Sequence, residues 1–179
     1  MTRRCVSQVA LCTILLVMST ACAADDPVAQ PANGWVTMTD EPSGARIALP
    51  EEAEPASDIA SDANGSRVTL RQYASTAAGG AVEVGFNVLD TRGGRYDLDT
   101  GVREVATSLQ GQVVSAQSTN IDGHDAVNVE VSYGGDNVVL FQLVNADEHV
   151  LQPLVAGPAS RRDVVEETFE QLTESLDVG

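Results

Sequence analysis

The two histidines, His124 and His149, are the side chains best suited to metal or acid–base chemistry in this chain. Imidazole can bind zinc or assist a nucleophile, and carboxylates neighbour both residues in the sequence. However, neither spacing matches a zinc motif, and the chain has no G-x-S-x-G nucleophile motif. We therefore interpret both as exposed histidines in turns. The sequence predicts no catalytic residue, no metal site and no cofactor.

A short loop offers a different kind of chemistry, since Arg92, Arg95 and Tyr96 lie close together in an otherwise acidic chain. Two guanidinium groups and a phenol could bind a carboxylate, a phosphate or a partner protein. The alternative is a solvated loop in which Arg95 pairs with Asp97 or Asp99. We retain the three residues as a candidate partner-binding or anion-binding loop.

Cys22 stands where lipoproteins carry the cysteine that becomes lipidated. The preceding residues Thr20 and Ala21 are small, as in a lipobox, although Ser19 replaces the usual Leu or Val. The alternative is ordinary secretion, with cleavage at the A-x-A site that ends at Ala23. We predict lipidation of Cys22.

Residues 1–23 have the layout of a bacterial export signal, because two arginines precede the apolar run Val9–Met18. That run is shorter than the about 20 apolar residues of a membrane span. We predict a signal peptide at 1–23, a polar tether at 24–33 and a single domain at 34–179. The expected location is the outer face of the cytoplasmic membrane through a lipid anchor, or alternatively secretion as a soluble protein.

Composition excludes several functions. Two of the ten basic residues lie in the signal, so eight arginines face 26 acidic residues and the mature chain carries −18. Such a charge repels nucleic acid. The chain has no lysine, which excludes P-loops and Schiff-base chemistry. All three cysteines lie in or beside the signal, so we expect no disulfide in the domain.

Periodicity predicts a mixed fold. Apolar residues at helical spacing predict a helix over Leu98–Gln110 and a C-terminal helix that begins at Ser160. Alternating and continuous apolar runs predict strands, and Pro153 marks the last of these as an edge strand. The expected strands are Ala45–Leu49, Ser66–Tyr73, Val82–Leu89, Gln112–Thr119, Val127–Tyr133, Asn137–Val144 and His149–Val155.

The order of these elements resembles the PsbP-like domain of bacterial exported lipoproteins, including the mycobacterial "probable lipoprotein" group. The resembling features are an early strand that ends at Pro50, the turn 121–126 and a closing helix that contains Phe169. The resemblance covers Trp35 to Val178. It implies an α+β fold, with an antiparallel sheet of about six or seven strands flanked by helices in an α/β/α sandwich. Family members include photosystem accessory subunits, a Ran-binding import factor and lipoproteins of unsettled role.

These observations favour a non-catalytic, exported interaction or accessory module, anchored to the membrane by lipid and bound to an unidentified envelope protein. One alternative is a carrier for a lipid or another apolar ligand. Another is an envelope hydrolase, which would require a histidine in a pocket beside a serine or a carboxylate. The carrier would require a cavity lined by residues such as Val82, Phe86, Val129 and Phe141.

Overall fold

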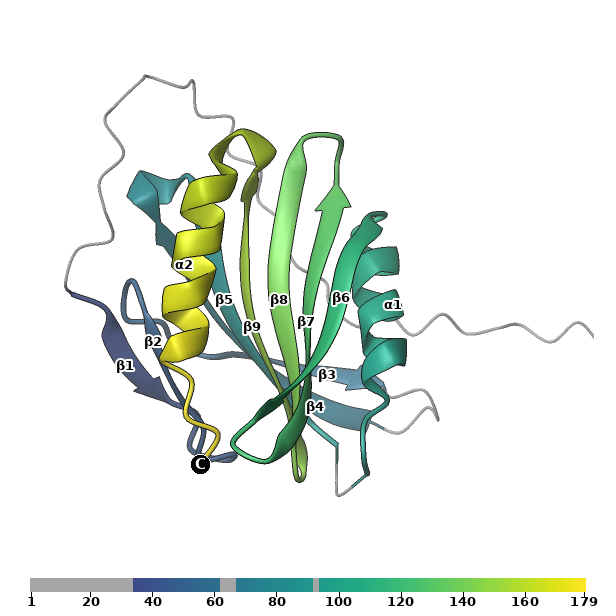
Figure 1. Cartoon of the computed structure of the whole chain (residues 1–179). Helices are drawn as coiled ribbons and strands as arrows, with labels where there is room; N and C mark the ends of the chain where they lie inside the picture. The colour runs from purple at the N-terminus through teal and green to yellow at the C-terminus, as the bar shows by residue number, and fades with distance from the viewer. Residues whose placement is uncertain (1–33, 62–66, 92–93) are drawn as a thin grey trace, which may run out of the picture.

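An antiparallel sheet is the centre of the computed structural model, which describes residues 34–61, 67–91 and 94–179 (Figure 1). The predicted signal, the tether, Cys22 and Arg92 lie outside the described residues. In the described part, seven strands form the sheet in the order β3-β4-β5-β9-β8-β7-β6. They are β3 (Ala56–Ser61), β4 (Arg67–Ala77), β5 (Val82–Asp90), β6 (Gln112–Ile121), β7 (His124–Tyr133), β8 (Asn137–Ala146) and β9 (His149–Pro158).

The remaining elements pack on this sheet. A two-stranded hairpin of β1 (Val36–Thr39) and β2 (Arg46–Leu49) precedes it. The two α-helices of the described residues are α1 (Leu98–Ser108) and α2 (Arg162–Glu174). Short 3-10 turns, η1 (Ala78–Gly80) and η2 (Ala159–Arg161), follow β4 and β9. No helix among the described residues is long and apolar enough to span a membrane.

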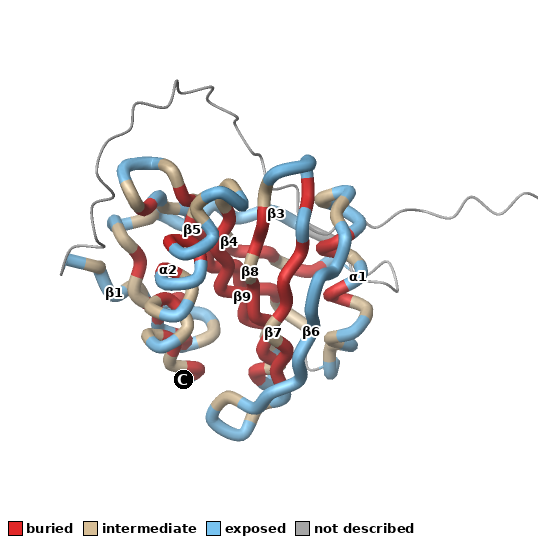
Figure 2. The backbone as a smooth tube through the Cα atoms, turned by 45° about the horizontal axis from the view of Figure 1, so that its top comes forward, coloured by how far each residue is buried: buried red, intermediate tan, exposed pale blue. Residues whose placement is uncertain are grey.

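Each face of the sheet has its own hydrophobic core, because successive strand residues point to opposite faces. On one face Phe86 and Leu151 pack with Leu172 of α2 and with Ile47 of the hairpin. On the other face a second set of apolar strand residues packs against Val105 and its neighbours on α1. Figure 2 shows this burial concentrated in the central strands. The structure confirms the expected α+β class, with an antiparallel sheet between helices.

Tight turns set the register of the β6–β7–β8–β9 meander. Ile121 pairs with His124, so the connecting turn is Asp122 and Gly123, and both have positive φ (50° and 93°). Two central residues with positive φ match the right-handed twist of a hairpin. Because this connection has only two residues, β7 turns back and pairs directly beside β6.

Two local predictions were wrong. Pro153 does not mark an edge, because β9 lies between β5 and β8. The β8–β9 pairing has a gap at Gln142 and Leu143, which accommodates a residue without an N–H group. The C-terminal helix begins after Arg161, with no side-chain cap, because Ser160 belongs to η2. The prediction also omitted β1 and β3.

Gly157 provides a test of how closely α2 packs on β9. A Cβ atom at this position would lie 2.9 Å from Cγ2 of Val165 on α2. We expect Gly157→Ala to lower the free energy of unfolding by about 1–3 kcal/mol, because overpacking forces the helix outward. Urea unfolding measures the change. In the Gly157→Ala background, adding Val165→Ala should cost less than it costs in the wild type, whereas fully additive effects would contradict this packing.

Candidate functional site

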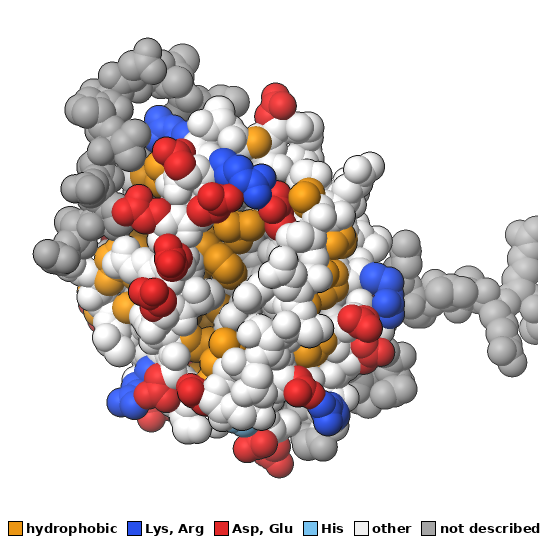
Figure 3. Space-filling view, viewed as in Figure 1, with side chains coloured by type: hydrophobic (Ala, Val, Ile, Leu, Met, Phe, Trp, Pro, Cys, Tyr) orange, Lys and Arg blue, Asp and Glu red, His pale blue; other side chains and the backbone are white. Residues whose placement is uncertain are grey.

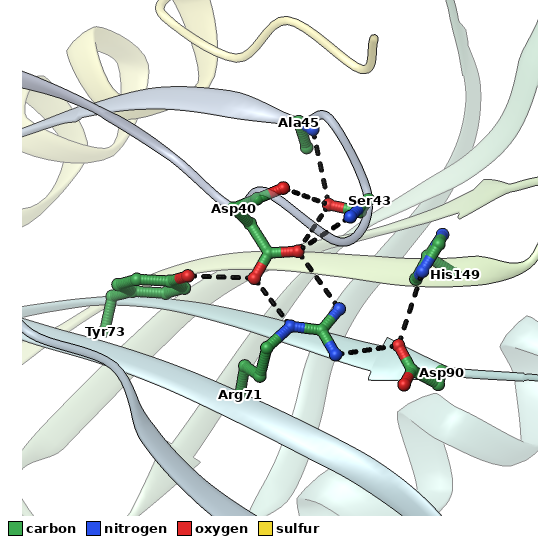
Figure 4. A network of polar contacts seen from close by, with 7 residues as sticks. All are labelled: Asp40, Ser43, Ala45, Arg71, Tyr73, Asp90 and His149. Atoms are coloured by element: carbon green, nitrogen blue, oxygen red, sulfur yellow. Dashed lines mark hydrogen bonds and ion pairs between the residues drawn. The ribbon is translucent and has the colours of Figure 1, made fainter.

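A buried guanidinium group joins the hairpin to the sheet (Figure 4). Arg71 on β4 donates from Nε and Nη2 to the two carboxylate oxygens of Asp40, at 2.6 and 3.0 Å. Its Nη1 donates to Oδ1 of Asp90 at 2.9 Å. The Arg71 side chain is 8% exposed and that of Asp40 is 0% exposed. This bidentate pair is therefore shielded from solvent and geometrically specific.

Asp40 receives further hydrogen bonds from its surroundings. The Tyr73 hydroxyl donates to it at 2.8 Å, and Oγ of Ser43 donates at 2.6 Å. Burial alone would raise the pKa of Asp40, but the hydrogen bonds and the charge of Arg71 outweigh burial and hold that pKa below its usual value. Burial and the Asp40 carboxylate raise the pKa of Tyr73 to about 12. At neutral pH the site therefore holds an ionised Asp40 and a neutral Tyr73.

The same network reaches a histidine. Nε2 of His149 lies 3.3 Å from Oδ1 of Asp90, which also accepts from Arg71. Nδ1 of His124 lies 3.0 Å from the carbonyl oxygen of Asn145. Both histidines are half-buried, and they line one pocket of about 240 Å³ with Asp147, Glu148, Ser43 and the C-terminal Gly179. The interpretation of exposed turn histidines was therefore wrong.

Topology explains this meeting. His124 begins β7 and His149 begins β9, and both strands flank β8 in antiparallel pairing. The two strand starts therefore lie at the same end of the sheet. The predicted meander already contained this signal, because the starts of alternate antiparallel strands share an edge.

The chemistry available to this pocket differs from that of a serine hydrolase. A triad needs the nucleophile to be hydrogen-bonded to the imidazole. Here Oγ of Ser43 donates to Asp40, and the contacts continue through Arg71 and Asp90 before they reach His149. Among residues 34–61, 67–91 and 94–179, no group of three or more His, Cys, Asp or Glu side chains is arranged to hold a metal ion.

Of the three residues of the predicted arginine loop, Arg95 and Tyr96 are described by the structure, and they contact different parts of the domain. Arg95 forms an ion pair with Asp125 on β7, and not with Asp97 or Asp99 as in the alternative of a solvated loop. The Tyr96 hydroxyl donates to Oε2 of Glu104 at 3.1 Å, and the Tyr96 carbonyl accepts from Asn145 at 2.9 Å. These contacts anchor Tyr96 to α1 and to the sheet. Arg95 remains at the surface, 77% exposed, with its charge neutralised by Asp125.

Two further spaces bear on ligand binding. A groove of about 420 Å³ runs between the hairpin and β4, lined by Met38, Pro55 and Tyr73 among others. A cavity of about 20 Å³ lies beneath α1, beside Asn87 and Gln152. A cavity of that size holds about one water molecule.

Strand β6 lies where the sequence predicts a strand, but its exposure on both faces was not predicted. Nine of its ten residues are exposed, and Ile121 is half-buried. Val113 and Val114 retain 43% and 57% of their surface exposed. The strand pairs with β7 and, within the described residues, with no other strand. Figure 2 shows β6 as an exposed band along the sheet edge.

No family model and no curated protein matches this chain. Among solved structures, the chain is similar to cyanobacterial PsbP (CyanoP) from Synechocystis sp. PCC 6803, with 15% identity over 89% of this chain and 98% of that chain and a TM-score of 0.48. It is also similar to PA94 from Pseudomonas aeruginosa, a protein of unknown function described as a putative regulator. That likeness has 14% identity over 76% of this chain and 92% of that chain, with a TM-score of 0.45. Membership of the PsbP-like lipoprotein group stays a prediction.

The Asp40–Arg71 pair predicts a pH-dependent stability. We expect Asp40→Asn to lower the free energy of unfolding at pH 7 by about 3–5 kcal/mol, because the buried Arg71 loses its main counter-charge. The hydrogen bonds and the charge of Arg71 hold the pKa of Asp40 in the folded state below its ordinary value of 3.8. The ionised Asp40 therefore contributes to the free energy of unfolding above about pH 4, and this contribution is lost as the pH falls through the pKa of Asp40 in the folded state. Urea unfolding between pH 7 and pH 2 measures both effects.

Asp147→Asn is the matched control, because Asp147 is exposed in a turn with φ 50°, which asparagine tolerates. It should change stability by less than about 0.5 kcal/mol. The stability gap between wild type and Asp40→Asn should narrow below pH 4. A gap of constant size down to pH 2 would refute the role given to the Asp40 charge.

Proposed function

We propose that this chain is an exported, lipid-anchored, non-catalytic protein-interaction module of the bacterial cell envelope, and that it binds its partner through β6. The observation that carries the proposal is the long outer strand that neither helix covers. The export layout of residues 1–23, Cys22 and the order of the elements support assignment to the PsbP-like lipoprotein group.

Edge strands expose unpaired backbone N–H and C=O groups, and proteins usually protect them with charges, proline, bulges or short length. Strand β6 has ten residues and contains no charged residue, proline or glycine. One register shift, between Val113 and Ser115, interrupts the pairing of β6 with β7 near the start of β6. From Ser115 to Ile121 the pairing is regular. The opposite edge, β3, is six residues long and carries Asp58. Of these two edges, β6 is the better suited to receive a strand from a partner.

The carrier alternative has less support. Val82 and Phe86 belong to the core beneath α2, whereas Val129 and Phe141 belong to the core beneath α1. The four side chains are at most 3% exposed and point to opposite faces of the sheet, so they do not line a common cavity. A carrier would have to use the groove beside the hairpin, which is open to solvent along β1.

The hydrolase alternative meets the requirement stated for it, but a catalytic triad also needs a nucleophile hydrogen-bonded to the imidazole. His149 lies in a pocket beside a carboxylate, as such an enzyme would need. The nearby Ser43 hydroxyl, however, is directed at Asp40 and not at an imidazole. This arrangement supports a structural role for the network.

The binding role of β6 can be tested in cells with a photo-reactive amino acid at Gln117, an exposed position on β6. We expect discrete adducts with a protein partner, and we expect them to disappear when Ser118→Lys is added, because a charge on an edge strand opposes strand addition. The same photo-reactive residue at Glu170, exposed on α2, is the control. Equal adducts at both positions, or adducts that survive Ser118→Lys, would count against β6.

The lipid anchor can be tested by mass. We expect the mature protein to begin at Cys22, to carry the added mass of acyl chains and to fractionate with membranes. Cys22→Ser should abolish the acyl mass and the membrane fractionation, whereas Cys12→Ser, inside the signal, should change neither. A soluble, unacylated chain that begins at Ala24 would establish the secreted alternative.

A further inference from the structure

We propose that the strand received by β6 is the β6 of a second copy of this chain, which gives a two-fold dimer with one continuous sheet. The inference rests on the proposed function of β6 as a binding edge and names its partner. Closed two-fold dimers are the commonest symmetric assemblies of soluble proteins, and their interface pairs a surface with itself.

Charge favours β6 as the self-pairing surface. Two copies that each carry −18 repel one another wherever acidic side chains meet. Figure 3 shows carboxylates gathered over α2, whose exposed side carries Glu166, Glu167, Glu170 and Glu174. Strand β6 has no charged side chain along its ten residues. A carboxylate in the adjoining strand, Asp125 of β7 opposite Asn120, is paired with Arg95. Self-association is therefore least opposed along β6.

The register of β6 suits a symmetric pair. Its regular stretch, Ser115–Ile121, follows the shift near Val113, and its middle residue is Ser118. In an antiparallel pair centred on Ser118, odd-numbered residues lie opposite odd-numbered ones and even opposite even. The side chains of each pair therefore point to the same face of the joint sheet. The pairs would be Ser118 with itself, Gln117 with Thr119, Ala116 with Asn120 and Ser115 with Ile121.

These pairs are chemically compatible. Side-chain hydrogen bonds are possible where Ser118 meets itself and where Gln117 meets Thr119, and no pair brings like charges together. Side chains on both faces of β6 are exposed, so neither helix covers the edge on either side. A largely polar contact of this length is weak by itself, but anchoring both copies in one membrane would raise their effective concentration.

The test uses the full mature chain, extracted from membranes in mild detergent and measured by sedimentation and native mass spectrometry over a range of concentrations. We expect a monomer–dimer equilibrium that shifts toward dimer at higher salt, because salt screens the repulsion between acidic copies. Ser118→Lys and Ser118→Asp should each weaken the dimer roughly a hundredfold, because each places like charges opposite one another at the two-fold axis.

Mixing the two variants should restore association as a heterodimer, because the opposite charges then meet. Ser132→Lys is the matched control, since Ser132 is also exposed, but on β7, which already has a neighbour on both sides. It should dimerise as the wild type does. A wild-type chain that is monomeric at every concentration, a Ser118→Lys dimer, or a mixture that does not associate would overturn the proposal.

Disulfide cross-linking tests the dimer without a charged variant, which could fold poorly. The domain has no cysteine, so Ser118→Cys introduces a single thiol there. We expect mild oxidation to link it to its counterpart in a second copy, and to leave Ser132→Cys unlinked. Should the chain prove monomeric while the β6 adducts in cells persist with another protein, the dimer fails and the interaction module stands. Loss of both results would refute both.

Discussion

The ion pair between Asp40 and Arg71 is the contact on which the arrangement of this domain depends. It joins residues 31 positions apart, one in the turn after β1 and one in the middle of β4. Buried ion pairs add little net stability over apolar contacts, but they penalise every arrangement that leaves a charge unpaired. The hairpin can therefore sit on the sheet in one position, where both oxygens of Asp40 meet the guanidinium group. Ile47 and Leu49 on β2 then complete the core beneath α2.

From that position the network continues over three neighbouring strands, β4, β5 and β9. Asp90 closes β5 and bonds both Arg71 and His149, so the start of β9 is held against the end of β5. Arg162 gives α2 a comparable attachment, since two of its nitrogens donate to the buried Glu130 of β7 at 2.8 and 2.7 Å. Polar contacts thus position the hairpin and α2, while apolar packing supplies the two cores. Strand β6 joins the core beneath α2 only at its last residue, Ile121, and the rest of the strand is exposed and pairs with β7 alone among the described strands.

Much of this architecture is readable from the sequence, because alternation and helical spacing are local signals. The strands of the meander and both helices were expected within a few residues of their observed bounds. Strands β1 and β3 were missed because they are short and largely exposed, and therefore lack alternation. Pro153 was misread because a gap in the pairing can replace a missing N–H group inside a sheet. The Asp40–Arg71 pair has no local signature, and the histidine pocket emerges only when strand order is considered.

The place of β9 in the sheet also determines when the protein can finish folding. Its pairing with β5 brings together segments such as Asn87 and Gln152, which are 65 residues apart. The entropy cost of closing so long a loop is incurred before the contacts between β5 and β9 can stabilise the chain, so this step is intrinsically slow. The hairpins of the meander, in contrast, form from neighbouring segments. A chain that is emerging from a pore cannot complete its central sheet before its last third is free. Under the export proposed above, this delay would keep the chain unfolded until most of it has crossed the membrane.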